Sequence, residues 1–163
     1  LKSQGFISKV GISVYDSSQI NQALVFFKPD IIQLPINVLD QRLIRDGTLP
    51  YLSTLGIEVH ARSVFLQGLL LMNINKMPKY FEPWLPLLSK WHEFCGDHLI
   101  SPLHAALGFV GSLKDVSYSL VGVQSHDQLK EILMDSTFLH SYDFNQFACD
   151  DQQLIDPSVW RIV

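Results

Sequence analysis

Four short apolar stretches divide the chain, and a segment with helical periodicity follows each of them. The stretches are rich in β-branched residues and lie at 7–13, 31–34, 57–62 and 116–121, which predicts four buried strands. The segments after them carry apolar residues three and four positions apart, as amphipathic helices do. Strands that alternate with helices at this spacing are typical of a parallel α/β fold.

Capping residues indicate where the expected helices begin and end. Asp16 or Ser17 can begin the first helix, Thr48 can cap one that Gly56 ends, and Ser101 stands before another. The helices that these signals and the periodicity predict span 17–26 or 17–27, 48–55, 84–95, 102–110 and 128–134. The apolar stripe of the first would consist of Ile20, Ala23, Leu24 and Phe27.

Composition narrows the possible partners. The net charge of -4 argues against nucleic acid, which needs a basic face. The longest apolar run, 64–72, contains Gln67 and Gly68 and falls short of the 18 or so residues that a membrane span needs. Cys95 and Cys149 lie far apart in unrelated contexts, which is usual in a reducing compartment. No signal peptide pattern is visible at the start, so we expect a cytoplasmic protein.

Three histidines near Cys95 suggest a metal site, but their spacing opposes it. On a continuous helix, positions three residues apart drift by about 60°, so His92 and His98 would diverge by about 120°. Zinc needs four ligands that converge at about 2 Å, and His104 lies on the next helix. We therefore expect two exposed histidines beside a buried cysteine, and no metal.

One long phrase resembles a known family. The sequence GIEVHARSVFLQGLL at 56–70 is similar to the seventh strand and following loop of the aldo-keto reductases, in the subgroup with Arg-Ser in place of Tyr-Ser. The likeness continues on both sides. It implies the C-terminal half, strands five to eight, of a TIM-type (β/α)8 barrel, because a complete barrel needs about 250 residues. Residues 1–134 would form the β/α units, and 135–163 a strap across the barrel wall.

The resemblance implies an oxidoreductase that uses NADPH or NADH to reduce a small carbonyl compound (aldehyde, ketone or sugar) to an alcohol. KVGISVY at 9–15 gives Ser13 a contact to the nicotinamide carboxamide, although Val14 replaces the family's Asn. DIIQLPINVLD at 30–40 gives Gln33 the same role. A lone amide in an apolar strand also needs a polar partner in any case. We expect Asn37 to be a loop-forming residue rather than a cofactor contact.

Arg62 stands where the family stacks an aromatic ring on the nicotinamide. A guanidinium is planar, so it can stack or bind an anion. Alternatively, Glu58, His60 and Arg62 alternate onto one strand face and could form an internal ion network. The loop that follows would wrap the pyrophosphate with backbone N–H groups, and its residues include Ser63, Phe65, Gln67 and Gly68.

The last matching phrase is VGVQSHDQLKEIL at 121–133. It is similar to the turn that holds the adenosine phosphate at a helix N-terminus, an anion site. This implies contacts from Gly122, Ser125 and Gln128, although Gly122 and Gln128 replace two cations common in the family. The choice between NADPH and NADH therefore stays open, and Ser125 is in any case a helix N-cap.

The family's acid–base residues, Asp, Tyr, Lys and His, have no counterpart here, so we expect this chain alone to be inactive. Its abrupt start suggests a fragment, whose partner would be the missing N-terminal half of the barrel or a second copy of the chain. The alternative is a noncatalytic half-barrel that binds or scaffolds other molecules. Its decayed cofactor site would explain the departures at Val14, Gly122, Val123 and Ile132.

Overall fold

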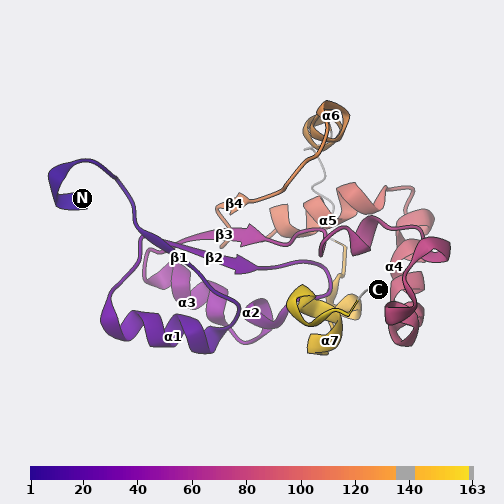
Figure 1. The fold of residues 1–163 in the computed structure, drawn as a ribbon, viewed down its shortest axis with the longest axis horizontal. Coiled ribbons are helices and arrows are strands. Elements are labelled where there is room, and N and C mark those ends of the chain that lie inside the picture. The colour runs from indigo at the N-terminus through magenta and orange to yellow at the C-terminus, as the bar shows by residue number, and fades with distance from the viewer. Residues whose placement is uncertain (135–141, 162–163) are drawn as a thin grey trace.

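The computed structural model describes residues 1–134 and 142–161. Within these residues a parallel sheet has the strand order β1-β2-β3-β4, and helices connect its strands (Figure 1). The parallel α/β prediction is therefore confirmed. The strands are β1 (Gly11–Ser13), β2 (Ile31–Pro35), β3 (Glu58–Arg62) and β4 (Tyr118–Ser119).

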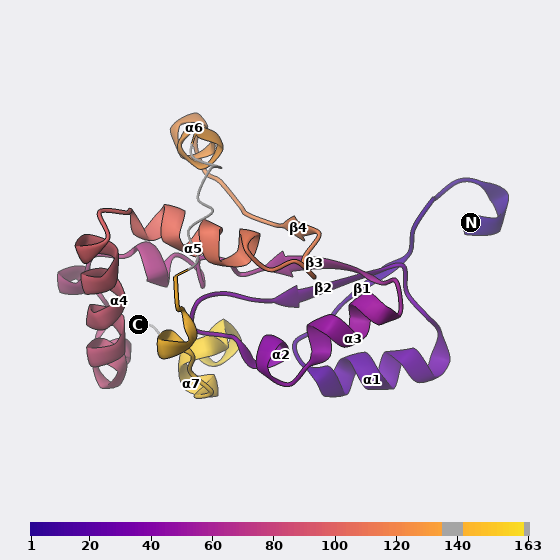
Figure 2. The same cartoon turned by 180° about the vertical axis from the view of Figure 1, so that it is seen from behind.

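The helices follow the strands in chain order. The α-helices are α1 (Ser17–Phe26), α2 (Arg42–Arg45), α3 (Thr48–Thr54), α4 (Leu85–Asp97), α5 (Pro102–Gly111), α6 (His126–Met134) and α7 (Gln152–Ile155). Short 3-10 helices are η1 (Lys2–Gln4), η2 (Leu69–Leu71), η3 (Ile74–Lys76), η4 (Lys79–Trp84), η5 (Asn145–Phe147) and η6 (Pro157–Val159). Helix α6 and the first residues of the chain stand away from the rest (Figures 1 and 2).

The strand register separates an apolar face from a polar one. Ser13 lies opposite Gln33, Gln33 opposite His60, and His60 opposite Tyr118, so these four form one row on the same face. The other face buries Ile32 and Val59 completely. The connecting helices cover this apolar face, because its side chains are buried only when something packs against them.

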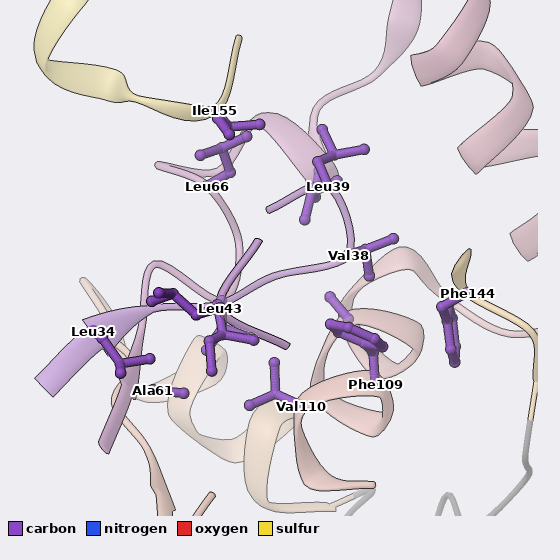
Figure 3. Packing of buried hydrophobic residues seen from close by; sticks show 14 of the residues in the cluster. Leu34, Val38, Leu39, Leu43, Ala61, Leu66, Phe109, Val110, Phe144 and Ile155 are labelled. Carbon is purple, nitrogen blue, oxygen red and sulfur yellow. The ribbon is translucent and has the colours of Figure 1, made fainter. Parts of the chain in front are cut away.

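The buried core extends beyond the sheet. Figure 3 shows Leu34 and Ala61 from the strands near Val110 of α5, with Phe109 close to Phe144. The rings of Phe109 and Phe144 are 5.2 Å apart. Of the expected strap at 135–163, residues 135–141 and 162–163 lie outside the described residues.

The described part of that segment contacts the loop after β2. Gln41 Nε2 donates to the Phe144 carbonyl at 2.8 Å, and Cys149 N–H donates to the Leu39 carbonyl at 2.8 Å. Four apolar side chains of the segment are buried: Phe144, Phe147, Leu154 and Ile155.

The predicted strands at 7–13 and 116–121 are too long. Before β1, the Val10 carbonyl still accepts hydrogen bonds from Asp30 and Ile31, whereas residues 7–9 are exposed. The backbone bonds Ser117 N–H to Val59 O and Leu120 N–H to Ala61 O flank β4. Among residues 1–134 and 142–161 both strands pair on one side only, so few ladder bonds hold them in strand geometry.

Two details of the predicted helices are wrong. Thr48 is the first helical residue rather than the cap; Gly47 caps α3, and Asp46 Oδ1 accepts the Thr48 N–H at 2.9 Å. The expected apolar stripe of α1 included Phe27, which is 43% exposed, whereas Ile20 is buried. Asp16 caps α1 through the Gln19 N–H, as expected.

Candidate functional site

The loop after β3 has an unusual backbone. Ser63, Leu66 and Gln67 have positive φ angles of 60°, 46° and 54°, and Gly68 follows at 85°. Residues other than glycine avoid this left-handed region, and such strain persists where the surroundings fix it, often at functional sites. Three successive left-handed residues turn the chain sharply at the carboxyl end of β3.

Hydrogen bonds inside the loop decide which N–H groups remain available. Leu66 N–H donates to the Ser63 carbonyl and Gly68 N–H to the Phe65 carbonyl, both at 2.9 Å. These two N–H groups are therefore used within the loop itself. The N–H groups of Val64, Phe65 and Gln67 donate to no backbone or side-chain acceptor within 1–134 and 142–161.

A pocket of about 650 Å³ lies between this loop and the segment from β4 into α6. It brings together residues that lie more than fifty positions apart, because β3 and β4 are neighbours in the sheet. The predicted site residues that line it are Ser63, Phe65, Gln67, Gly68, Gly122 and Gln128. Glu131 is the one ionisable side chain among its described lining residues.

The turn into α6 is held by its own side chains. Ser125 Oγ accepts the Gln128 N–H at 3.2 Å, which confirms Ser125 as an N-cap. Gln128 Oε1 in turn accepts the Gln124 N–H at 2.7 Å. Ser125 caps the helix without lining the pocket, whereas the Gln128 side chain bonds to the turn and Gln128 also lines the pocket.

Ser13 and Gln33 contact each other on the polar face of the sheet. Ser13 Oγ lies 3.2 Å from Gln33 Oε1, across the β1–β2 pair. This contact supplies the polar partner that an amide in an apolar strand needs. Neither residue lines the large pocket.

Arg62 lies at the carboxyl end of β3 without a carboxylate partner among the described residues. Its guanidinium donates to the Val14 carbonyl and to Ser63 Oγ, each at 3.2 Å, and lies 4.4 Å from the centre of the Tyr15 ring. A small pocket of about 50 Å³ is lined by Arg62 and Ser63. Because Ser63 also lines the large pocket, it connects the two.

The alternative of an internal ion network holds for Glu58 and His60 but not for Arg62. Glu58 pairs with Lys9, and its Oε1 lies 2.7 Å from His60 Nε2. The hydrogen bond from Lys9, and then that from His60, lowers the pKa of the Glu58 carboxyl. The His60 ring also contacts the Tyr118 ring edge-on at 5.1 Å. The network thus lies toward the amino-terminal end of β3, whereas Arg62 lies at its carboxyl end.

The histidines around Cys95 are placed differently from each other. Cys95 is buried, and burial raises the pKa of its thiol to about 12, which opposes the thiolate that zinc requires. His98 is exposed and bonds the Phe94 carbonyl at 2.8 Å. His92 was expected to be exposed but is half-buried. Among residues 1–134 and 142–161, no three His, Cys, Asp or Glu side chains are grouped as metal ligands.

A scan against protein families matches the chain to the Aldo/keto reductase family over residues 1–148. The chain belongs to this family. No curated protein matches it in sequence. In the described part of this aldo/keto reductase chain, no helix is both long and apolar enough to cross a membrane.

Solved aldo-keto reductases share the fold. The holo form of AKR11C1 from Bacillus halodurans is 20% identical, with a TM-score of 0.71, and the alignment covers 99% of this chain and 55% of that one. Its apo form gives 0.70 at 20% identity, with coverage of 99% and 56%. The thermostable aldo-keto reductase Tm1743, in complex with the inhibitor epalrestat, gives 0.63 at 19% identity, with coverage of 88% and 48%. This aldo/keto reductase chain thus spans about half the length of these structures and forms a partial (β/α)8 barrel.

Sequence reasoning missed several residues around the site of this aldo/keto reductase chain. Tyr15 lies under Arg62, and Glu131 lines the large pocket. Asn37 was recognised only as a loop-former, yet its side chain also reaches Ser63. A polar side chain directly after a buried strand was the available signal for Asn37, whereas no local pattern indicates Tyr15 or Glu131.

Proposed function

We propose that this chain forms most of the dinucleotide pocket of an NAD(P)H-dependent oxidoreductase that reduces a small carbonyl compound to an alcohol. The observation that carries the proposal is the pocket of about 650 Å³ between the loop after β3, with its left-handed residues, and the turn into α6. It lies beyond the carboxyl ends of parallel strands, where α/β barrels bind their ligands. The cofactor would supply the hydride, and the protein would orient it.

The residues suit the polar groups of such a cofactor. The amide of Gln33 and the hydroxyl of Ser13 match a nicotinamide carboxamide in hydrogen-bonding capacity. Arg62, whose planar guanidinium already lies against Tyr15, suits the face of a nicotinamide ring. The unbonded N–H groups of Val64, Phe65 and Gln67 suit pyrophosphate oxygens. Gly122, Ser125 and Gln128 would then lie toward the adenosine end.

The acid–base residues would come from outside this chain. The chain corresponds to 55% of the AKR11C1 chain, so the proposed reaction is that of the full-length protein, meaning this chain with whatever sequence flanks it. We propose that residues 1–163 alone reduce no carbonyl substrate. Consumption of NADPH or NADH with an aldehyde by residues 1–163 alone would contradict this division.

Cofactor binding by the full-length protein tests the proposal. Calorimetry should show micromolar binding of NADH or NADPH, and Gly122→Leu should weaken it at least tenfold. A Cβ at Gly122 meets no neighbouring atom, so the added side chain should enter the pocket without disturbing the fold. Gly111→Leu is the matched control, because a Cβ there also meets nothing and Gly111 is outside the pocket lining. No binding of either cofactor at millimolar concentration would refute the proposal.

One observation favours a noncatalytic binding or scaffolding protein as the second candidate. The described lining of the large pocket includes Glu131 and no Lys or Arg, which is a weak environment for a dinucleotide's phosphates. The same calorimetry separates the candidates. The second predicts that neither cofactor binds and that Gly122→Leu has no effect beyond that of Gly111→Leu.

A further inference from the structure

Asn37 connects the loop after β2 to the loop after β3. It is completely buried, and its Oδ1 accepts the N–H groups of Leu39 and Asp40, each at 2.9 Å. Its Nδ2 donates to the Ser63 carbonyl at 3.2 Å. Acceptors and donor of the side chain are therefore both used, and the amide is held in one orientation.

The Ser63 carbonyl is held from two sides. It accepts from Asn37 Nδ2 and also from the Leu66 N–H, at the residue where the backbone first becomes left-handed. A peptide unit is planar and trans, so its N–H points opposite to its C=O. Fixing the Ser63 carbonyl thus fixes the Val64 N–H, which faces away from Asn37. Val64 lines the large pocket, and its N–H donates to no described residue.

We propose that Asn37 is a positioning residue for the dinucleotide pocket: it holds the Ser63–Val64 peptide so that the Val64 N–H can donate to a pyrophosphate oxygen. The inference rests on the proposed function. Asn37 acts through Ser63 and contacts no ligand itself. A hydrogen bond to an ionised oxygen is stronger than a neutral one, so its loss should weaken cofactor binding about tenfold.

The substitution Asn37→Asp tests this with almost no change of shape. It keeps an oxygen that can accept from Leu39 and Asp40 but replaces the donor by a carboxylate oxygen, which repels the Ser63 carbonyl. Burial raises the pKa of an introduced carboxyl, and its protonated form can donate again. The charged groups that line the small pocket beside Ser63 are Asp16, Asp40, Arg42, Arg62 and Asp156. Of these, Asp40 and Arg42 pair with each other.

The measurement is the ratio of NADH dissociation constants, variant to wild type, at pH 8 and pH 5.5 in the full-length protein. For Asn37→Asp the ratio should be about ten at pH 8 and fall severalfold at pH 5.5. Asn73→Asp is the control, because Asn73 Oδ1 also accepts a backbone N–H, from Asn75 at 2.9 Å, at an exposed position. A ratio near one at pH 8, or an equal loss at both pH values, would overturn the inference.

A second measurement uses only the wild-type protein, so it does not depend on how the variants fold. The amide resonance of Val64 should shift on addition of NADH and stay in place with reduced nicotinamide riboside, which lacks the pyrophosphate. An unchanged Val64 resonance in a protein that binds NADH overturns the role of Asn37. Failure of the wild-type protein to bind NADH or NADPH at all contradicts the proposed function instead.

Discussion

Ser13 Oγ donates to Gln33 Oε1 at 3.2 Å, and the two residues lie directly opposite each other on β1 and β2. The bond uses one lone pair of the Gln33 amide oxygen and orients its NH2 group away from Ser13. Gln33 thus keeps two donors and a second lone pair, whereas Ser13 has its hydroxyl proton occupied.

Gln33→Leu in the full-length protein should weaken cofactor binding more than Ser13→Ala does. Losing the amide removes both its donor and its acceptor, at a cost of roughly tenfold in affinity, whereas losing the hydroxyl should cost only about threefold. Calorimetric titration of both variants checks this. Equal losses, or a larger loss for Ser13→Ala, would mean that Gln33 is only structural.

Glu131 should disfavour the additional phosphate of NADPH. With one carboxylate and no cation among the described lining residues, we expect NADH to bind at least as tightly as NADPH. Glu131→Lys should improve NADPH binding severalfold with less effect on NADH, and the gain should shrink in high salt. Glu93→Lys, at an exposed position of α4, is the control for the change in net charge. A gain of the same size for Glu93→Lys would exclude a local effect.

Trp91 should stabilise the loop region through a buried hydrogen bond. Its Nε1 donates to the Leu70 carbonyl at 3.0 Å, and both residues are completely buried. Trp91→Phe leaves that carbonyl without its donor and should reduce the free energy of unfolding by about 1–3 kcal/mol. Urea denaturation measures this. Trp84→Phe should cost less, because Trp84 Nε1 bonds to the exposed carboxylate of Asp151, and equal costs would contradict the role of burial.

The isolated chain should associate. In the part of the chain that the structure describes, each end of the sheet has a strand paired on one side only, β1 and β4. Open edges invite pairing with another chain. Large apolar side chains are exposed in the segments that flank these strands along the chain, among them Ile7, Val10, Val25, Phe26, Leu120, Leu129 and Leu133. A two-fold dimer that pairs β1 of each copy with β4 of the other would close an eight-stranded barrel. Sedimentation at micromolar concentration should show a dimer or larger, and a stable monomer with a cooperative melt would contradict it.

The sequence by itself determined the order and type of the main elements. Ile31, Ile32 and Val59 lie in strands, the Asp16 side chain caps α1, and Gly56 has φ 67° after α3. These features depend on neighbours within about four residues, because caps, periodicity and left-handed glycines are local interactions. The phrase at 56–70 also led correctly to the aldo/keto reductase family.

Only the tertiary structure decided which groups meet. Asn37 and Ser63 are 26 positions apart, and Arg62 contacts Val14 across 48 positions. Glu131 of α6 lines the same pocket as the loop after β3. The same holds for the short strands β1 and β4, whose lengths depend on having one neighbour rather than two. Such contacts form only when the parallel sheet brings the carboxyl ends of its strands to one edge, and that arrangement is set by packing of the whole core rather than by any local pattern.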